Sequence, residues 1–85
     1  MKTKTFETKI SNEEKYRQLG LNISHYRKVK KLSQGELAER VHISRGHLSH
    51  IESPNMSSSF SIATLFDIAE ALDIEPKLLF EFKEI

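Results

Sequence analysis

The 85-residue sequence contains no cysteine and no tryptophan, and only three glycines and two prolines. Without cysteine the chain can form neither a disulfide framework nor a thiolate metal site, and this composition fits a reducing compartment. A domain of this length lies near the size at which a single hydrophobic core is marginal. Oligomerisation is therefore the simplest remaining way to add stability.

Long apolar runs are missing as well. No stretch approaches the roughly 18 apolar residues of a membrane span, and the opening residues MKTKTFETKI lack the apolar region of a signal peptide. We therefore expect a cytoplasmic protein without a membrane partner. We further expect residues 1–10 to form a flexible tail and residues 11–85 to form one domain.

Neither sign of charge dominates the chain, whose net charge is +1, but its two parts differ. Residues 1–58 carry eleven Lys and Arg against six Glu, a balance of +5, whereas residues 59–85 carry two Lys against six acids, a balance of −4. This division predicts a polyanion-binding face and a separate surface for another contact. An accidental asymmetry of a solvated surface explains the charges equally well.

Helix-start signals organise the chain. Residues 11–14 (SNEE) and 33–36 (SQGE) match the capping box, in which Ser caps the third helical amide and Glu reaches back to the cap. Ser44 and Ser61 are further N-caps, and Pro76 suits the first position of a final helix. The patterns predict five helices, over about 12–30, 34–41, 45–52, 62–72 and 76–82. The predicted apolar stripe of the fourth helix is Ile62, Leu65, Phe66, Ala69 and Leu72.

The second and third helices are separated by a very short corner, which is the arrangement of a helix-turn-helix. Ala38 supplies the small residue that such close packing requires. The corner residue is His42, where the backbone needs a positive φ that usually selects glycine. Histidine is enriched at positive φ, so the corner can form at a cost of about 1 kcal/mol. Asp73 is placed to turn the chain out of the fourth helix in the same way.

These residues resemble the Cro/C1 (XRE) family of helix-turn-helix DNA-binding domains, over roughly Leu19 to Phe82. The resemblance implies an all-α fold class, a compact five-helix bundle of the lambda repressor-like kind. The family usually has glycine where this chain has Lys31, His42 and Asp73, and it has a shorter loop in place of SPNMSSSFS. The matching segments are IxxYR at 23–27, LSQGELA at 32–38, IS at 43–44, LSHIE at 48–52, AEALDI at 69–74 and LLF at 78–80.

The resemblance implies which residues contact DNA. Arginine can bond bidentately to a guanine edge, and serine can donate or accept there. A glycine inside a helix costs about 1 kcal/mol, which is understandable where a backbone must approach a neighbour. That neighbour is either a base or another part of the protein. The predicted base contacts are Arg45, Gly46, His47, Ser49 and His50, and the predicted phosphate contacts are Gln34, Ser44 and Asn55.

Two further assignments concern protein contacts. By resemblance, Arg27 and Glu52 form a salt bridge between the first helix and the end of the third, and Gln34 braces the recognition helix. The C-terminal segment PKLLFEFKEI has more apolar residues than one helical face can bury, which is typical of an interface. Completion of the core is the alternative explanation. The predicted homodimer interface is Leu78, Leu79, Phe82 and Ile85.

Metal and catalytic sites are not indicated. His42, His47 and His50 lie close in sequence, but structural zinc takes four ligands, commonly with thiolates. No nucleophile elbow, phosphate-binding glycine loop or carboxylate pair is present, so we expect neither an enzyme nor a cofactor. The sequence predicts a dimeric, sequence-specific transcriptional regulator, a repressor or autoregulator binding an inverted repeat of double-stranded DNA. The alternative is an antitoxin-like or regulatory module whose acidic C-terminal face binds a protein partner.

Overall fold

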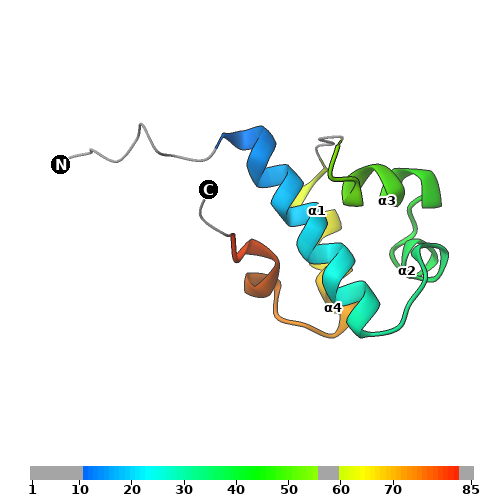
Figure 1. The fold of residues 1–85 in the computed structure, drawn as a ribbon. Helices are drawn as coiled ribbons and strands as arrows, with labels where there is room; N and C mark the ends of the chain where they lie inside the picture. Colours follow the sequence, from blue (N-terminus) through cyan, green and yellow to red (C-terminus); the bar gives the residue numbers. More distant parts are fainter. Residues whose placement is uncertain (1–10, 56–59, 83–85) are drawn as a thin grey trace.

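The computed structural model describes residues 11–55 and 60–82, and these residues are all-helical (Figure 1). The predicted tail at 1–10, part of the 53–61 loop and Ile85 lie outside the described residues. The four predicted α-helices are present, whereas the fifth is a short 3-10 helix rather than an α-helix. This element has only five residues, beginning with Pro76, and it lacks a side-chain cap, so it stays a single short 3-10 turn. The elements are α1 (Asn12–Val29), α2 (Gln34–Val41), α3 (Arg45–Glu52), α4 (Ile62–Leu72) and η2 (Pro76–Phe80).

Serine caps begin each α-helix, as predicted. The hydroxyl oxygen of each capping serine accepts a hydrogen bond of 2.9–3.1 Å from the backbone amide three residues ahead. These serines are Ser11, Ser33, Ser44 and Ser61. Among the described helices, α2 has the full capping box, in which the Glu36 carboxylate accepts a hydrogen bond from the Ser33 amide at 2.8 Å. For residues 11–14 the predicted hydrogen bond from the Ser11 amide back to the Glu14 carboxylate was wrong. The Glu14 carboxylate accepts two hydrogen bonds from Arg17 instead.

Three helices end in the same motif. Lys31, His42 and Asp73 follow α1, α2 and α4, and their φ angles are 62°, 61° and 58°. In each case the next amide donates to the carbonyl five residues earlier, at 3.0–3.1 Å, which is the Schellman arrangement. The residues that supply these amides are apolar and pack against the core: Leu32, Ile43 and Ile74. The predicted left-handed conformations at His42 and Asp73 are therefore confirmed.

The core lies where α1 and α4 meet the α2–α3 pair and η2. In α4 the predicted inner stripe was partly wrong, because Ile62 and Phe66 are 57% and 50% exposed. The buried face of α4 is shifted around the helix and includes Ile68 instead. The fully buried large side chains are Ile23, Leu37, Leu48, Ile51, Leu65, Ile68, Leu72 and Leu79.

The C-terminal segment contributes to the core more than predicted. Leu79 is 0% exposed, so its assignment to the dimer interface was wrong. Leu78 and Phe82 are half-buried. The side-chain amide of Asn22 donates to the carbonyl oxygens of Leu79 and Glu81 at 2.9 and 3.1 Å, which fixes this segment to α1. None of the helices in the described ranges is long and apolar enough to cross a membrane.

Candidate nucleic-acid interface

The exposed face of α3 is the candidate interface. Leu48, Ile51 and Glu52 are buried and hold the helix against the rest of the domain. The helical step of 100° turns the remaining residues toward solvent. Of the predicted base contacts, four are exposed and His47 is half-buried at the edge of the face. The exposed four are Arg45, Gly46, Ser49 and His50.

The two glycines in helices α1 and α3 serve different purposes. A Cβ atom added at Gly20 would overlap the backbone carbonyl oxygen of Ile51, so glycine lets α1 and α3 approach closely. A Cβ atom added at Gly46 would meet nothing within 4 Å. Crowding inside the described part of the protein therefore does not explain the glycine at position 46. Its backbone is open to an external neighbour.

Gly20 was not predicted as a packing residue. Its position inside the periodic segment of α1 was the available signal, because a glycine in a helix interior usually has a packing or functional reason. The predicted small residue at the α2–α3 contact, Ala38, is buried as expected. Gly20 thus sets how closely α1 and α3 approach, and Ala38 is buried within α2.

A buried polar network joins α1, α2 and α3, and it confirms the predicted Arg27–Glu52 pair. The Arg27 guanidinium donates to both Glu52 carboxylate oxygens at 2.8 and 2.9 Å. It also donates to the Leu32 carbonyl at 2.7 Å. The Gln34 side-chain amide donates to Glu52 Oε1 at 3.1 Å, as the expected brace of α3. Bidentate, charge-assisted bonds of this kind fix orientation, so α3 is presented as part of one rigid unit.

The predicted phosphate contacts lie at the ends of the same helices. Gln34 is the first residue of α2 and is half-buried beside the last residue of α3. Ser44 is exposed at the start of α3, where its hydroxyl oxygen accepts the His47 amide. Asn55 is exposed beyond α3, and its backbone amide donates to Ser53 Oγ at 3.3 Å. The positive ends of the α2 and α3 dipoles favour an anion at both N-termini.

The exposed faces of α3 and α4 differ in their charges. The only carboxylate of α3 belongs to Glu52, which is buried and paired with Arg27. The exposed face of α3 therefore carries Arg45 and histidines but no acid. In α4 and the segment around η2 the carboxylates are exposed instead. They belong to Asp67, Glu70, Asp73, Glu75 and Glu81. In the described residues there is no group of three or more His, Asp or Glu arranged to hold a metal ion.

Comparisons with known proteins agree with this geometry. Residues 20–84 match a family model described as a helix-turn-helix domain, and this range contains all of α2, α3 and α4. The restriction-modification controller protein C.AhdI from Aeromonas hydrophila is 31% identical, with a TM-score of 0.70 over 76% of this chain and 96% of that chain. The hypothetical transcription factor NHTF from Neisseria has the same fold at 23% identity, with a TM-score of 0.72 over 86% of this chain and 83% of that chain. No curated protein matches the chain.

Proposed function

Because this chain belongs to the helix-turn-helix domain family of the Cro/C1 (XRE) type, we propose that it is a sequence-specific DNA-binding transcriptional regulator. One observation carries the proposal: α3 is held by buried contacts on one side and offers an acid-free, exposed face on the other. The open backbone at Gly46 lies on that face. A helix held in this way can enter the DNA major groove without rearrangement.

In the proposed complex the first turns of α3 read base edges. Arg45 bonds to O6 and N7 of a guanine, while Ser49 and His50 contact neighbouring bases. The absence of a side chain at Gly46 lets the helix backbone approach the bases, and His47 contacts DNA from the edge of the face. The phosphates on either side are held by Gln34, Ser44 and Asn55 together with helix-terminal amides.

The regulator acts as a homodimer on an inverted repeat, as a repressor or an autoregulator. One such domain makes too few base contacts to discriminate strongly against competing genomic sites. Two copies related by a two-fold axis read half-sites about one helical turn apart. The likeness to a restriction-modification controller supports a regulatory role for a domain of this size. We further propose a cytoplasmic location and no catalytic activity or cofactor.

The test begins with selection of bound duplexes from a random library, which identifies the preferred site. Arg45→Ala should then weaken binding to that site by about 1–3 kcal/mol and relax preference at one base pair. Gln34→Ala should weaken binding more evenly across sequences. Lys77→Ala is the matched control, because Lys77 is an exposed cation on η2, outside the α2–α3 pair. If Arg45→Ala leaves the affinities for preferred and scrambled duplexes unchanged, α3 does not lie in the groove.

A protein-binding module is the second candidate. The exposed acids of α4 and the η2 segment, beside exposed Ile62, Phe66 and Phe80, favour a contact with another protein. Salt separates the two candidates. DNA binding through several phosphates weakens steeply as salt is raised, whereas an apolar protein contact does not.

A further inference from the structure

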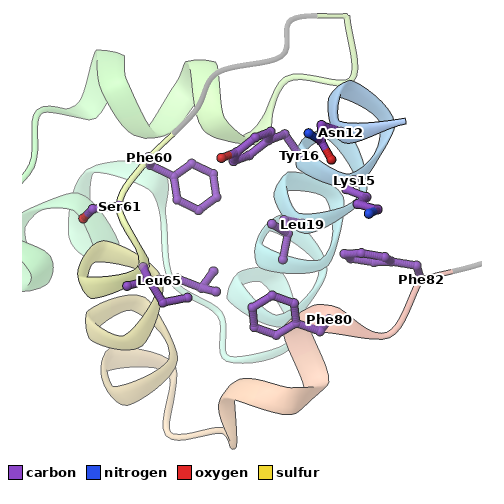
Figure 2. Close-up of a pocket in the computed structure, with 10 residues that line it drawn as sticks. Asn12, Lys15, Tyr16, Leu19, Phe60, Ser61, Leu65, Phe80 and Phe82 are labelled. Carbon is purple, nitrogen blue, oxygen red and sulfur yellow. The ribbon is translucent and has the colours of Figure 1, made fainter. Parts of the chain in front are cut away.

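An apolar groove of about 520 Å³ lies between the first turns of α1, the start of α4, and the end of η2 with the residues that follow it (Figure 2). Tyr16 and Phe60 meet edge to face at 5.6 Å on one side of it. Phe80 and Phe82, with ring centroids 6.3 Å apart, lie on the other. The volume of the groove is within the range of about 300–1,000 Å³ that is typical of small-molecule sites.

Buried core residues form part of the groove wall, so the packing of the domain sets the shape of the groove. Leu19 and Leu65 line it and are 7% and 1% exposed. The two hydrogen bonds donated by the Asn22 side chain hold the segment that carries Phe80 against α1. The groove is therefore formed before a ligand binds, as is usual for small-molecule sites.

Lys15 is the single charged residue among the described residues that line this groove. Its side chain is half-buried. Lys15 takes part in none of the ion pairs within residues 11–55 and 60–82, which join other residues. Because no described lining residue is an acid, the ammonium group of Lys15 is available to an anionic ligand.

The groups around Lys15 also favour an anion. Asn12, the first residue of α1, lies three residues before Lys15 and therefore on the same face of the helix. Both residues line the groove, and the Asn12 side-chain amide can donate a hydrogen bond to a carboxylate. Ile62, the first residue of α4, lines the groove as well. The groove thus adjoins the positive ends of two helix dipoles, which stabilise negative charge.

We propose that this groove binds a small aromatic monocarboxylate. The Lys15 ammonium group and the Asn12 side-chain amide hold the carboxylate at the edge of the groove formed by α1. The aromatic body of the ligand lies between the two pairs of rings, where it can pack edge to face or offset against them. This site goes beyond the proposed DNA-binding function and does not rest on it, because no residue of α2 or α3 is among the lining residues.

The size and lining of the groove favour a small molecule over a protein partner. A stable protein contact covers about 800 Å² on each partner, whereas this groove is a local hollow at which aromatic rings and one cation converge. A mainly apolar lining with a few polar groups that fix orientation is typical of ligand sites. The single cation matches one carboxylate, since a polyphosphate would bring more negative charge than Lys15 can compensate.

The first experiment titrates the wild-type protein with 2-naphthoate and, as a neutral ligand of similar shape, with 2-naphthylmethanol. Nuclear magnetic resonance of the backbone amides reports both affinity and location. The dissociation constant of 2-naphthoate should be about 0.1–1 mM, as expected for a ligand of this size. The alcohol should bind about fivefold more weakly, because it lacks the charge that pairs with Lys15. The amide signals of residues 12–19, 60–65 and 80–82 should shift, and those of α3 should not.

Variants separate the charge contact from the apolar contact. Lys15→Met should remove the preference for 2-naphthoate over the alcohol, whereas Lys15→Arg should keep it. Lys28→Met is the matched control, since Lys28 is an exposed cation of the same helix that does not line the groove. Phe80→Ser should weaken the binding of both ligands about fivefold, and it should fold normally because Phe80 is 44% exposed. Val29→Ser, at an exposed position of α1 outside the groove, should change neither affinity.

Three results would overturn the inference. The first is that the groove signals show no saturable shift up to about 5 mM 2-naphthoate, including the case in which a second copy of the chain covers the groove. The second is that the shifts centre on α3, which would assign the binding to its exposed cationic face. The third is that the acid and the alcohol bind equally well, or that the preference survives Lys15→Met. Binding at the groove stands even if the chain selects no preferred duplex, so the two proposals fail separately.

Discussion

Lys31 occupies the most strained position of the three helix ends, and its replacement by glycine should stabilise the protein. Its φ of 62° lies in the left-handed region, where a Cβ atom comes too close to the following carbonyl oxygen. Histidine and aspartate are enriched at such angles, but lysine is not. Lys31→Gly should therefore bring a larger gain than the corresponding changes at His42 and Asp73.

The magnitude follows from two opposing effects. The left-handed conformation costs an ordinary residue roughly 1–2 kcal/mol, and glycine removes this cost. Glycine also increases the conformational entropy of the unfolded chain, which reduces the gain in stability by about 0.4–1 kcal/mol. The hydrogen bonds from Lys31 and Leu32 to the last carbonyls of α1 are made by the backbone and remain. The net gain is about 0.5–1 kcal/mol, which raises the melting temperature by about 2–8 °C.

Thermal unfolding followed by circular dichroism measures this gain. Lys28→Gly is the matched control, because Lys28 is an exposed lysine within the last turn of α1. It should lower stability by about 1 kcal/mol. Lys31→Ala removes the charge and keeps the Cβ atom, so it should give little gain. A Lys31→Gly variant that melts no higher than the wild type, or a Lys31→Ala variant that gains as much, would show that the Cβ atom at position 31 is not strained.

Three other predictions follow from the helix contacts. Gly46→Ala should stabilise the free protein by up to about 1 kcal/mol and weaken DNA binding. Gly20→Ala should instead lower the melting temperature, because the added Cβ atom meets the backbone of α3. Melting curves and DNA-binding curves of both variants check this. Arg27→Met should cost about 3–5 kcal/mol in denaturant titrations, since it leaves the Glu52 carboxylate buried without its cation, and a cost below 1 kcal/mol would contradict the structure. The hydrogen bond from the Ser33 backbone amide lowers the pKa of Glu36 in the folded protein. The ionised Glu36 carboxylate therefore stabilises the fold fully above the ordinary glutamate pKa of about 4.3, and this stabilisation is lost as the pH falls through the lower folded-state pKa. E36Q should flatten this part of the pH–stability curve.

Local patterns predicted the helix boundaries well, because caps act over three or four residues. Ser33 and Glu36 are close enough in sequence for their reciprocal bonds to be read directly. The positive φ at His42 was also accessible, since the distance between two helices left no other place for the corner. The Arg27–Glu52 pair came from family resemblance, because nothing local relates residues 25 positions apart.

Tertiary contacts were the part that sequence could not supply. The spacing of Ile62, Leu65, Phe66 and Ala69 fits a helical face, but periodicity does not say where the centre of that face lies. Packing against α2 and η2 turned Ile62 and Phe66 outward. Leu79 was misassigned for a related reason, since a short 3-10 helix buries a residue that an amphipathic α-helix was expected to expose.

The division of α3 into a buried side and an open side has a consequence for how such regulators diverge. Folding depends on Leu48, Ile51 and Glu52, while Arg45 and Gly46 are free of internal packing demands. Under the proposed function, a new operator preference can therefore arise by exchange of surface residues, and the scaffold remains intact. At Gly46 almost any replacement improves helix propensity. Substitutions at Gly46 that change operator preference would thus also stabilise the fold. Selection for DNA binding alone must therefore keep the glycine in place.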